Sequence, residues 1–191
     1  MLLFGCILYC VFTILLTQFL QDFLVFRLSL LVDKYYLFWQ NKNMNKILLL
    51  NGPNINMLGQ REQALYGSLN LNQLETALIA QAKLLGYELN CFQSNSESAL
   101  INKIHTCSAE HISFILFNPA AFTHTSIALR DALLSVQLPF IEIHISNTYA
   151  RESFRHKSLL SDIAHGVVLG FGTYGYDIAL LAADKYLKTC N

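Results

Sequence analysis

Five short strand-like runs, four of them mainly apolar, alternate with helix-length segments between residues 46 and 187, and this alternation limits what the chain can fold into. The runs occupy residues 46–50, 88–93, 112–117, 139–145 and 166–171, and the run at 88–93 is the more polar one. Short continuous apolar runs are typical of parallel strands that are buried on both faces. Strands that alternate with helices predict an α/β domain whose parallel sheet is covered on both sides.

Polar residues follow several of these runs and are expected to meet at one edge of the sheet. Five strands in a chain of this size fit the flavodoxin-like order 2-1-3-4-5. In that order strands 1 and 3 are neighbours, and Asn54 and Asn118 follow their ends. His144 lies near the end of the fourth run, one strand further. Because open parallel sheets bind ligands at the carboxyl ends of their strands, these three side chains are predicted to face one crevice.

The first helix of the domain is marked by its expected ends. Asn72 with Glu75, three residues later, predicts a capped N-terminus, and Gly86 predicts the C-terminal stop. Further helices are expected at residues 97–107, 126–135 and 177–187.

Residues 1–43 differ from the rest of the chain, because no charged side chain occurs before Asp22. An uncharged stretch of about 20 residues can span a bilayer as a helix, so one interpretation is a membrane anchor. Arg27 and the two lysines that follow it would then keep the next domain in the cytoplasm. The other interpretation is a start assigned too early, because Met44 immediately precedes the first apolar run. Both interpretations leave one ordinary domain over residues 44–191.

Charge and motif content exclude several classes of function. Thirteen Lys+Arg balance thirteen Asp+Glu and form no basic stripe, so a nucleic-acid partner is not expected. The five cysteines include no CxxC, and His105, His111, His156 and His165 lack ligand spacing, so no disulfide framework or metal site is predicted. No phosphate-binding loop and no G-x-S-x-G elbow is present. No lysine suits a Schiff base buried at a strand end.

Tyr66 is a candidate general base if a cation lies close to it. A free tyrosine has a pKa of about 10, and lowering it to about 7 requires roughly 4 kcal/mol. A neighbouring cation favours the phenolate and can supply this energy. Arg61 lies five residues before Tyr66, and its guanidinium keeps its charge. The alternative is that Tyr66, one of nine tyrosines, only packs.

His144 is a candidate general acid. Glu142 lies two residues earlier, on the same face of the expected strand. A carboxylate in that place can fix the imidazole tautomer and hold a proton on the ring. The alternative is a histidine at a strand end whose hydrogen bonds are satisfied by structure alone.

Five motifs resemble, in order and spacing, those of the type II 3-dehydroquinate dehydratases. The resemblance as a whole extends from about Met44 to near the C-terminus. The motifs are Asn51-Gly52-Pro53-Asn54, then Leu58-Gly59-x-Arg61-Glu62-x-x-x-Tyr66-Gly67, then Asn118 with Thr123-His124-Thr125-Ser126, then Arg130-Asp131, and Glu142-x-His144-Ile145-Ser146-Asn147.

The resemblance implies a lyase that dehydrates 3-dehydroquinate to 3-dehydroshikimate through an enolate, without cofactor or metal. It implies that Tyr66 is the base, that Arg61 activates it and that His144 donates a proton to the departing hydroxyl. Glu142 would orient His144, and Asn54 would hold an ordered water near the enolate. The pathway would be the synthesis of chorismate and aromatic amino acids, in the cytoplasm.

The resemblance also implies a set of substrate contacts and an assembly. The backbone of Ile145 and Ser146 would bind the carboxylate, as exposed peptide N–H groups at a turn can do. The matching aspartate, Asp131, would reach across a subunit interface, in trimers assembled into a dodecamer. The side chains expected to contact substrate hydroxyls are Asn118, His124, Asp131 and Arg155.

Several alternatives stay open. Asp131 is also compatible with a charge on a helix surface, and Arg151 and Arg155 with a solvated face, with Arg155 the preferred substrate contact. A non-catalytic, membrane-tethered binding module of flavodoxin-like fold is the main rival, and the same reaction also serves quinate catabolism. Three positions depart from the family pattern: Gln63, where proline is usual, and Ser96 and Ser98 in the turn after strand 2.

Overall fold

The computed structural model describes residues 26–29, 31, 44–60 and 69–189. The chain divides into two compact units, Met1–Met44 and Asn45–Asn191. The second unit carries every motif singled out in the sequence. Among the described residues, no helix combines the length and the apolar character needed to cross a membrane. The uncharged stretch before Asp22, on which the anchor hypothesis rests, lies outside the described residues.

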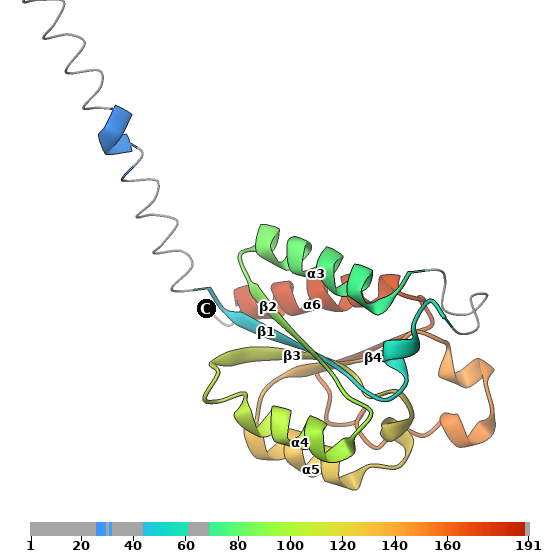
Figure 1. The fold of residues 1–191 in the computed structure, drawn as a ribbon. Coiled ribbons are helices and arrows are strands. Elements are labelled where there is room, and N and C mark those ends of the chain that lie inside the picture. The colour runs from blue at the N-terminus through green and yellow to red at the C-terminus, as the bar shows by residue number, and fades with distance from the viewer. Residues whose placement is uncertain (1–25, 30, 32–43, 61–68, 190–191) are drawn as a thin grey trace, which may run out of the picture. The chain divides into compact units, whose positions relative to one another are not determined.

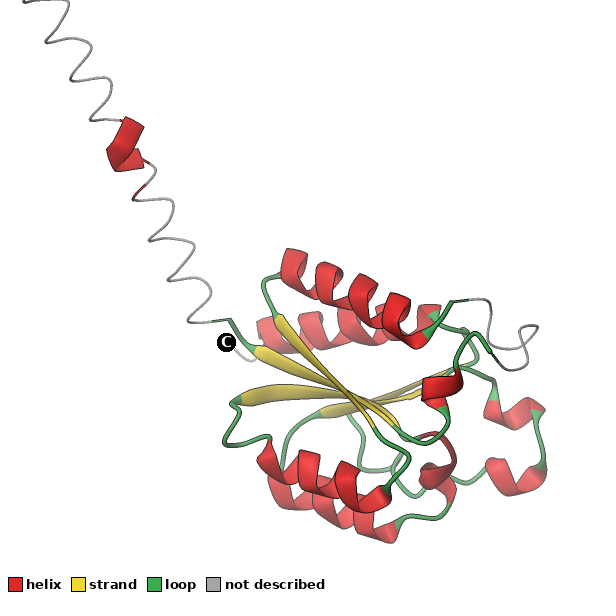
Figure 2. Ribbon diagram, viewed as in Figure 1, coloured by secondary structure: helices red, strands yellow, loops and turns green. Residues whose placement is uncertain are grey.

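The second unit is built on a five-stranded parallel sheet with the order β2-β1-β3-β4-β5. This confirms the predicted α/β fold class and strand order (Figure 2). The strands are β1 (Lys46–Asn51), β2 (Glu88–Gln93), β3 (Ile112–Asn118), β4 (Phe140–His144) and β5 (Gly166–Leu169).

Four helices cover the two faces of the sheet (Figure 1). They are α3 (Leu71–Leu85), α4 (Glu97–Thr106), α5 (Ile127–Val136) and α6 (Tyr174–Thr189). Helices α3 and α6 lie on one face, and α4 and α5 lie on the other. Each face of the sheet has its own hydrophobic core, and the side chains of β1 alternate between them. Ile47 and Leu49 pack in the core on the side of α3 and α6, and Leu48 and Leu50 in the core on the side of α4 and α5. None of the four has exposed surface. Burial on both faces explains why the strand is a continuous apolar run.

The N-cap of helix α3 lies two residues before the predicted cap. Asn70 is the N-cap: its Oδ1 accepts a hydrogen bond from the Gln73 backbone N–H (2.9 Å), and Gln73 Oε1 accepts one from the Asn70 N–H (3.1 Å). The prediction of Asn72 with Glu75 was therefore wrong, because two overlapping pairs have the same spacing and the earlier pair forms the capping box. The predicted stop at Gly86 is correct, since its φ of 90° is left-handed.

The backbone after β1 crosses closely over the backbone after β3. The Gly52 N–H donates to Asn118 O at 2.7 Å. A Cβ at Gly52 would lie 2.5 Å from Pro119 O, so no side chain fits there without moving one of the two loops. These two loops build the site described below.

Gly52→Ala is therefore expected to lower the free energy of unfolding by about 1–3 kcal/mol, the usual cost of overpacking. Gly166→Ala is the matched control, because no heavy atom lies within 4 Å of its added Cβ. That change is expected to stay within about 0.5 kcal/mol of wild type. Urea denaturation of both variants checks the difference, and equal midpoints for the two would contradict it.

Candidate active site

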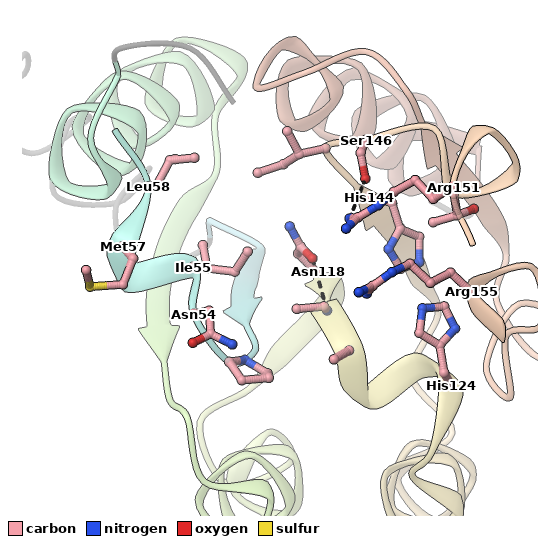
Figure 3. A pocket seen from close by; sticks show the side chains of 15 residues that line it. Asn54, Ile55, Met57, Leu58, Asn118, His124, His144, Ser146, Arg151 and Arg155 are labelled. Atoms are coloured by element: carbon pink, nitrogen blue, oxygen red, sulfur yellow. Dashed lines mark hydrogen bonds between the residues drawn. The ribbon is translucent and has the colours of Figure 1, made fainter. Parts of the chain in front are cut away.

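The candidate site is a cavity of about 260 Å³ at the carboxyl ends of β1, β3 and β4. Figure 3 shows Asn118 between Ile55, from the loop after β1, and His144, at the end of β4. The crevice predicted from strand order is therefore present. The predicted site residues that line it are Asn54, Asn118, His124, His144, Ile145, Ser146 and Arg155.

Among the described residues, two predicted site residues, Glu142 and Asp131, do not line this cavity. Glu142 lies on β4 with its side chain fully buried and bonded to His144. Asp131 is exposed on α5 and is absent from the lining. Arg61 and Tyr66 lie outside the described residues.

Asn54 enters the site through an unusual backbone conformation. Its φ is 66°, in the left-handed region that asparagine tolerates better than most residues. Its N–H donates to Asn95 Oδ1 at 2.8 Å, which ties the loop after β1 to the turn after β2. The fixed backbone holds the exposed Asn54 side chain at the cavity wall.

Asn118 is held by a buried chain of hydrogen bonds. Its Nδ2 donates to the Tyr176 hydroxyl at 2.7 Å, and that hydroxyl donates to Asn51 Oδ1 at 2.9 Å. Asn118 Oδ1 accepts from the Ala120 N–H at 3.1 Å, which fixes the orientation of the amide. Burial raises the pKa of Tyr176, so it remains a neutral phenol that can both donate and accept. Sequence reasoning missed Tyr176 and Asn51 as support for the site.

His144 and Glu142 form a buried pair, with Nε2 and Oε1 2.7 Å apart. Burial acts to raise the pKa of Glu142, but hydrogen bonds from His144, Thr123 and Ser158, with the charge of His144, hold it below its ordinary value. An ionised carboxylate only accepts hydrogen bonds, so Nε2 of His144 carries a hydrogen. The other ring nitrogen, Nδ1, makes no hydrogen bond to Glu142 and is therefore the nitrogen that can act on a substrate.

His124 lies beside His144, with ring centroids 6.5 Å apart and ring planes 12° from parallel. Its Nδ1 is 2.7 Å from Lys157 O. Because a carbonyl oxygen only accepts, Nδ1 of His124 carries a hydrogen, and Nε2 keeps a lone pair in the neutral ring. The two rings lie almost parallel, but the hydrogen that each donates to the protein is on a different nitrogen: Nε2 in His144 and Nδ1 in His124.

Two arginines from the loop after β4 complete the wall. This loop contains two single-turn 3-10 helices, η3 (Thr148–Ala150) and η4 (Ser153–Arg155). Arg151 and Arg155 both line the cavity, so Arg151 is closer to the site than its sequence context suggested. Arg151 Nη1 donates to Ser146 Oγ at 3.4 Å, and Arg155 Nε donates to Glu152 Oε2 at 2.8 Å.

The site has groups for anion binding and for proton transfer. Exposed backbone N–H groups and arginines suit a carboxylate, and the N–H groups of arginine, amide and imidazole side chains also suit hydroxyl groups. Within residues 26–29, 31, 44–60 and 69–189, no cluster of three or more His, Cys, Asp or Glu could hold a metal ion. The arrangement is suited to a small polyhydroxylated acid that receives a proton from an imidazole.

The chain matches a family model described as "Dehydroquinase class II" over residues 45–184. It is 59% identical over 143 residues to a 3-dehydroquinate dehydratase of Histophilus somni (strain 2336), covering 75% of this chain and 95% of that protein. It is 60% identical over 140 residues to the 3-dehydroquinate dehydratase of Thioalkalivibrio sulfidiphilus (strain HL-EbGR7), covering 73% of this chain and 95% of that protein.

Solved structures agree with these matches. The type II dehydroquinase from Propionibacterium acnes superimposes with a TM-score of 0.71 at 39% identity, covering 74% of this chain and 97% of that one. The type II dehydroquinase from Butyrivibrio crossotus DSM 2876 gives a TM-score of 0.71 at 41% identity, covering 74% and 98%.

Proposed function

This chain belongs to the dehydroquinase class II family, and from this premise we propose that it dehydrates 3-dehydroquinate to 3-dehydroshikimate. The reaction belongs to the shikimate pathway, which leads to chorismate and the aromatic amino acids. The observation that carries the proposal is the buried Glu142–His144 pair beside a cavity that arginines and amides line. Binding alone needs no such pair, which speaks against the non-catalytic module.

In the proposed mechanism Tyr66 acts as the general base and His144 as the general acid of the dehydration. The Tyr66 phenolate removes the proton next to the carbonyl, and the electron pair moves to the oxygen to form an enolate. Arg61 favours the phenolate and stabilises the developing charge. Collapse of the enolate expels the hydroxyl, which takes the Nδ1 proton of the His144 imidazolium and leaves as water. The ring is left neutral with its hydrogen on Nε2, bonded to Glu142. Asn54 would hold an ordered water near the enolate oxygen.

The substrate carboxylate is proposed to bind the backbone of Ile145 and Ser146, at the turn that follows β4. Asn118, His124 and Arg155 are proposed to contact its hydroxyl groups, and all three line the cavity. Asp131 is exposed on its own subunit, which supports a contact with a neighbouring subunit's site. We therefore also propose that the protein forms trimers assembled into a dodecamer.

The location of the enzyme depends on residues 1–43. We propose a cytoplasmic enzyme whose catalytic domain spans residues 44–191, with a start at Met44. If residues 1–43 are translated as an anchor, the domain would be held at the membrane on its cytoplasmic side. Use of the same reaction in quinate catabolism would involve the same site.

The function is tested by the ultraviolet absorbance of the conjugated enone product from 3-dehydroquinate. The full chain and a chain that starts at Met44 are both expected to form it at equal kcat, with and without borohydride, because the enolate route has no imine to reduce. Loss of activity only with borohydride would indicate a lysine imine. No product from folded protein would refute the dehydratase and favour a binding module.

A further inference from the structure

The carboxylate of Glu142 is surrounded by three side-chain donors, and only one of them is the proposed acid. Glu142 has no exposed surface. Besides His144, it accepts hydrogen bonds from Thr123, at Oε1, and from Ser158, whose Oγ is 2.9 Å from Oε1 and 3.0 Å from Oε2. Thr123 precedes α5, and Ser158 lies in the loop between η4 and β5, so three separate segments meet on one carboxylate.

The hydroxyl of Ser158 is held so that it can only donate. The backbone N–H groups of Leu160 and Ser161 both donate to Ser158 Oγ, each at 3.0 Å. A hydroxyl has two lone pairs and one proton, so these two bonds occupy its acceptor capacity. The remaining proton of Ser158 then points toward Glu142 or toward Thr123, whose Oγ1 is 2.7 Å away.

This arrangement also fixes the proton of Thr123. Ser158 has no lone pair left for it, so the Thr123 hydroxyl donates to Glu142 Oε1. With Ser158 donating to Glu142, two hydroxyl protons and the Nε2 hydrogen of His144 converge on the carboxylate. A protonated Glu142 would bring another hydrogen into a shell of donors, so the shell selects the ionised form.

The residues on either side of Ser158 bind His124 and Thr123. Lys157 O accepts from His124 Nδ1, and the Leu159 N–H donates to Thr123 O at 2.8 Å. Consecutive residues 157–159 thus contact both imidazoles of the site, directly or through Glu142. A displacement of this segment would be transmitted to His124 and His144 together.

We propose that Ser158, together with Thr123, is a positioning residue that acts through Glu142 to hold the proton-donating imidazole of His144 in one tautomer and one orientation. The two hydroxyls keep Glu142 as a fixed anion, and the anion keeps a hydrogen on Nε2. The proton that the imidazolium gives to the departing hydroxyl is then the one on Nδ1, which faces the substrate. This role rests on the proposed dehydratase function.

The test compares Thr123→Val and Ser158→Ala, with Ser161→Ala as the matched control from the same loop. Each of the first two is expected to lower kcat about tenfold, the size of a lost hydrogen bond to a charged group, with KM changed by less than about twofold. Thr123→Ser and Ser158→Thr keep a hydroxyl and should restore most of kcat. Ser161→Ala is expected to match wild type.

The pH profile supplies a readout that a purely structural role would not change. Fewer donors raise the pKa of Glu142, so its protonation begins at higher pH and the acidic limb of kcat moves upward by about one unit. His144 is the charged group that faces Glu142 and lowers its pKa, with His124 beyond it. Ser158→Ala also removes the acceptor of the Leu160 and Ser161 N–H groups and could disturb the loop for that reason. Thr123→Val keeps both of these hydrogen bonds, so the same effect in that variant is not due to a disturbed loop.

A second readout is independent of turnover: the ¹⁵N spectrum of the His144 ring, assigned with His144→Asn. At a pH where the ring is neutral, wild type is expected to show the Nε2–H tautomer, and the Thr123→Val/Ser158→Ala double variant a mixture of the two tautomers. The proposal is overturned if wild-type kcat, acidic limb and tautomer all persist in folded Thr123→Val and Ser158→Ala. If wild type itself makes no product, the dehydratase proposal fails, while the tautomer still decides the positioning role.

Discussion

Replacement of His144 by asparagine is expected to lower kcat about 10²–10⁴-fold, the usual contribution of a positioned general acid. Asparagine is close in size to the ring and keeps a polar group next to Glu142, but it cannot deliver a proton to the departing hydroxyl. The bond from Nε2 to Glu142 Oε1 is 2.7 Å long and fixes which ring nitrogen is left for that task. Because the proposed substrate contacts by Asn118, His124 and Arg155 remain, KM should change far less than kcat.

The matched control is His105→Asn, which changes an exposed histidine in the last turn of α4. Its kcat should equal that of wild type. Steady-state kinetics by product absorbance, with circular dichroism to show equal folding, separates the two variants. A His144→Asn enzyme within about tenfold of wild-type kcat would remove His144 as the acid and transfer the role to another group.

Replacement of Tyr66 by phenylalanine is expected to lower kcat by about 10⁴-fold, the upper end for loss of a positioned base. Only the phenolic oxygen is lost, so the change tests proton removal and little else. A tyrosine is a useful base near pH 7 only if its pKa is lowered by about three units, and Arg61 is the cation proposed to do this. The expected signature is a loss of kcat with little change in the affinity for a competitive substrate analogue.

Tyr87→Phe is the control for the loss of a phenolic hydroxyl. Tyr87 directly precedes β2, at the amino end of the sheet, and donates to Asp184 Oδ1 at 2.9 Å. Burial and Asp184 raise the pKa of Tyr87 to about 12, the opposite of what a base requires. This variant should retain wild-type kcat. Exchange of the substrate α-proton with deuterated solvent, still catalysed by Tyr66→Phe, would show that another group removes the proton.

The fold was predictable because its signals are local and repeated. Residues 47–50 form a continuous apolar run, and they are buried on both faces of the sheet. The period of two along a strand placed Glu142 and His144 on one side, as the structure has them. The cap of α3 was mistaken because Asn70 and Asn72 each have a partner three residues on, and sequence alone does not rank them.

The support of the site was not predictable in the same way. Thr123 and Ser158 meet Glu142 from 19 and 16 residues away, and nothing in their local sequence indicates a buried carboxylate. Tyr176 is one aromatic residue in an amphipathic helix, where packing is the usual role. Such contacts depend on how the segments are brought together in three dimensions. The catalytic roles of Arg61 and Tyr66 stay predictions.

The chain of hydrogen bonds from Asn51 through Tyr176 to Asn118 has a consequence for synthesis. Tyr176 is 125 residues from Asn51 and 58 residues from Asn118, so this closure has the largest sequence separation in the site. Contacts of long separation form late, because the loop entropy is lost before the contact stabilises anything. While the chain emerges from a ribosome, β1 and β3 are both made before α6 exists. A nascent chain therefore lacks the Tyr176 support of Asn118 until α6 has been made and has docked on the sheet.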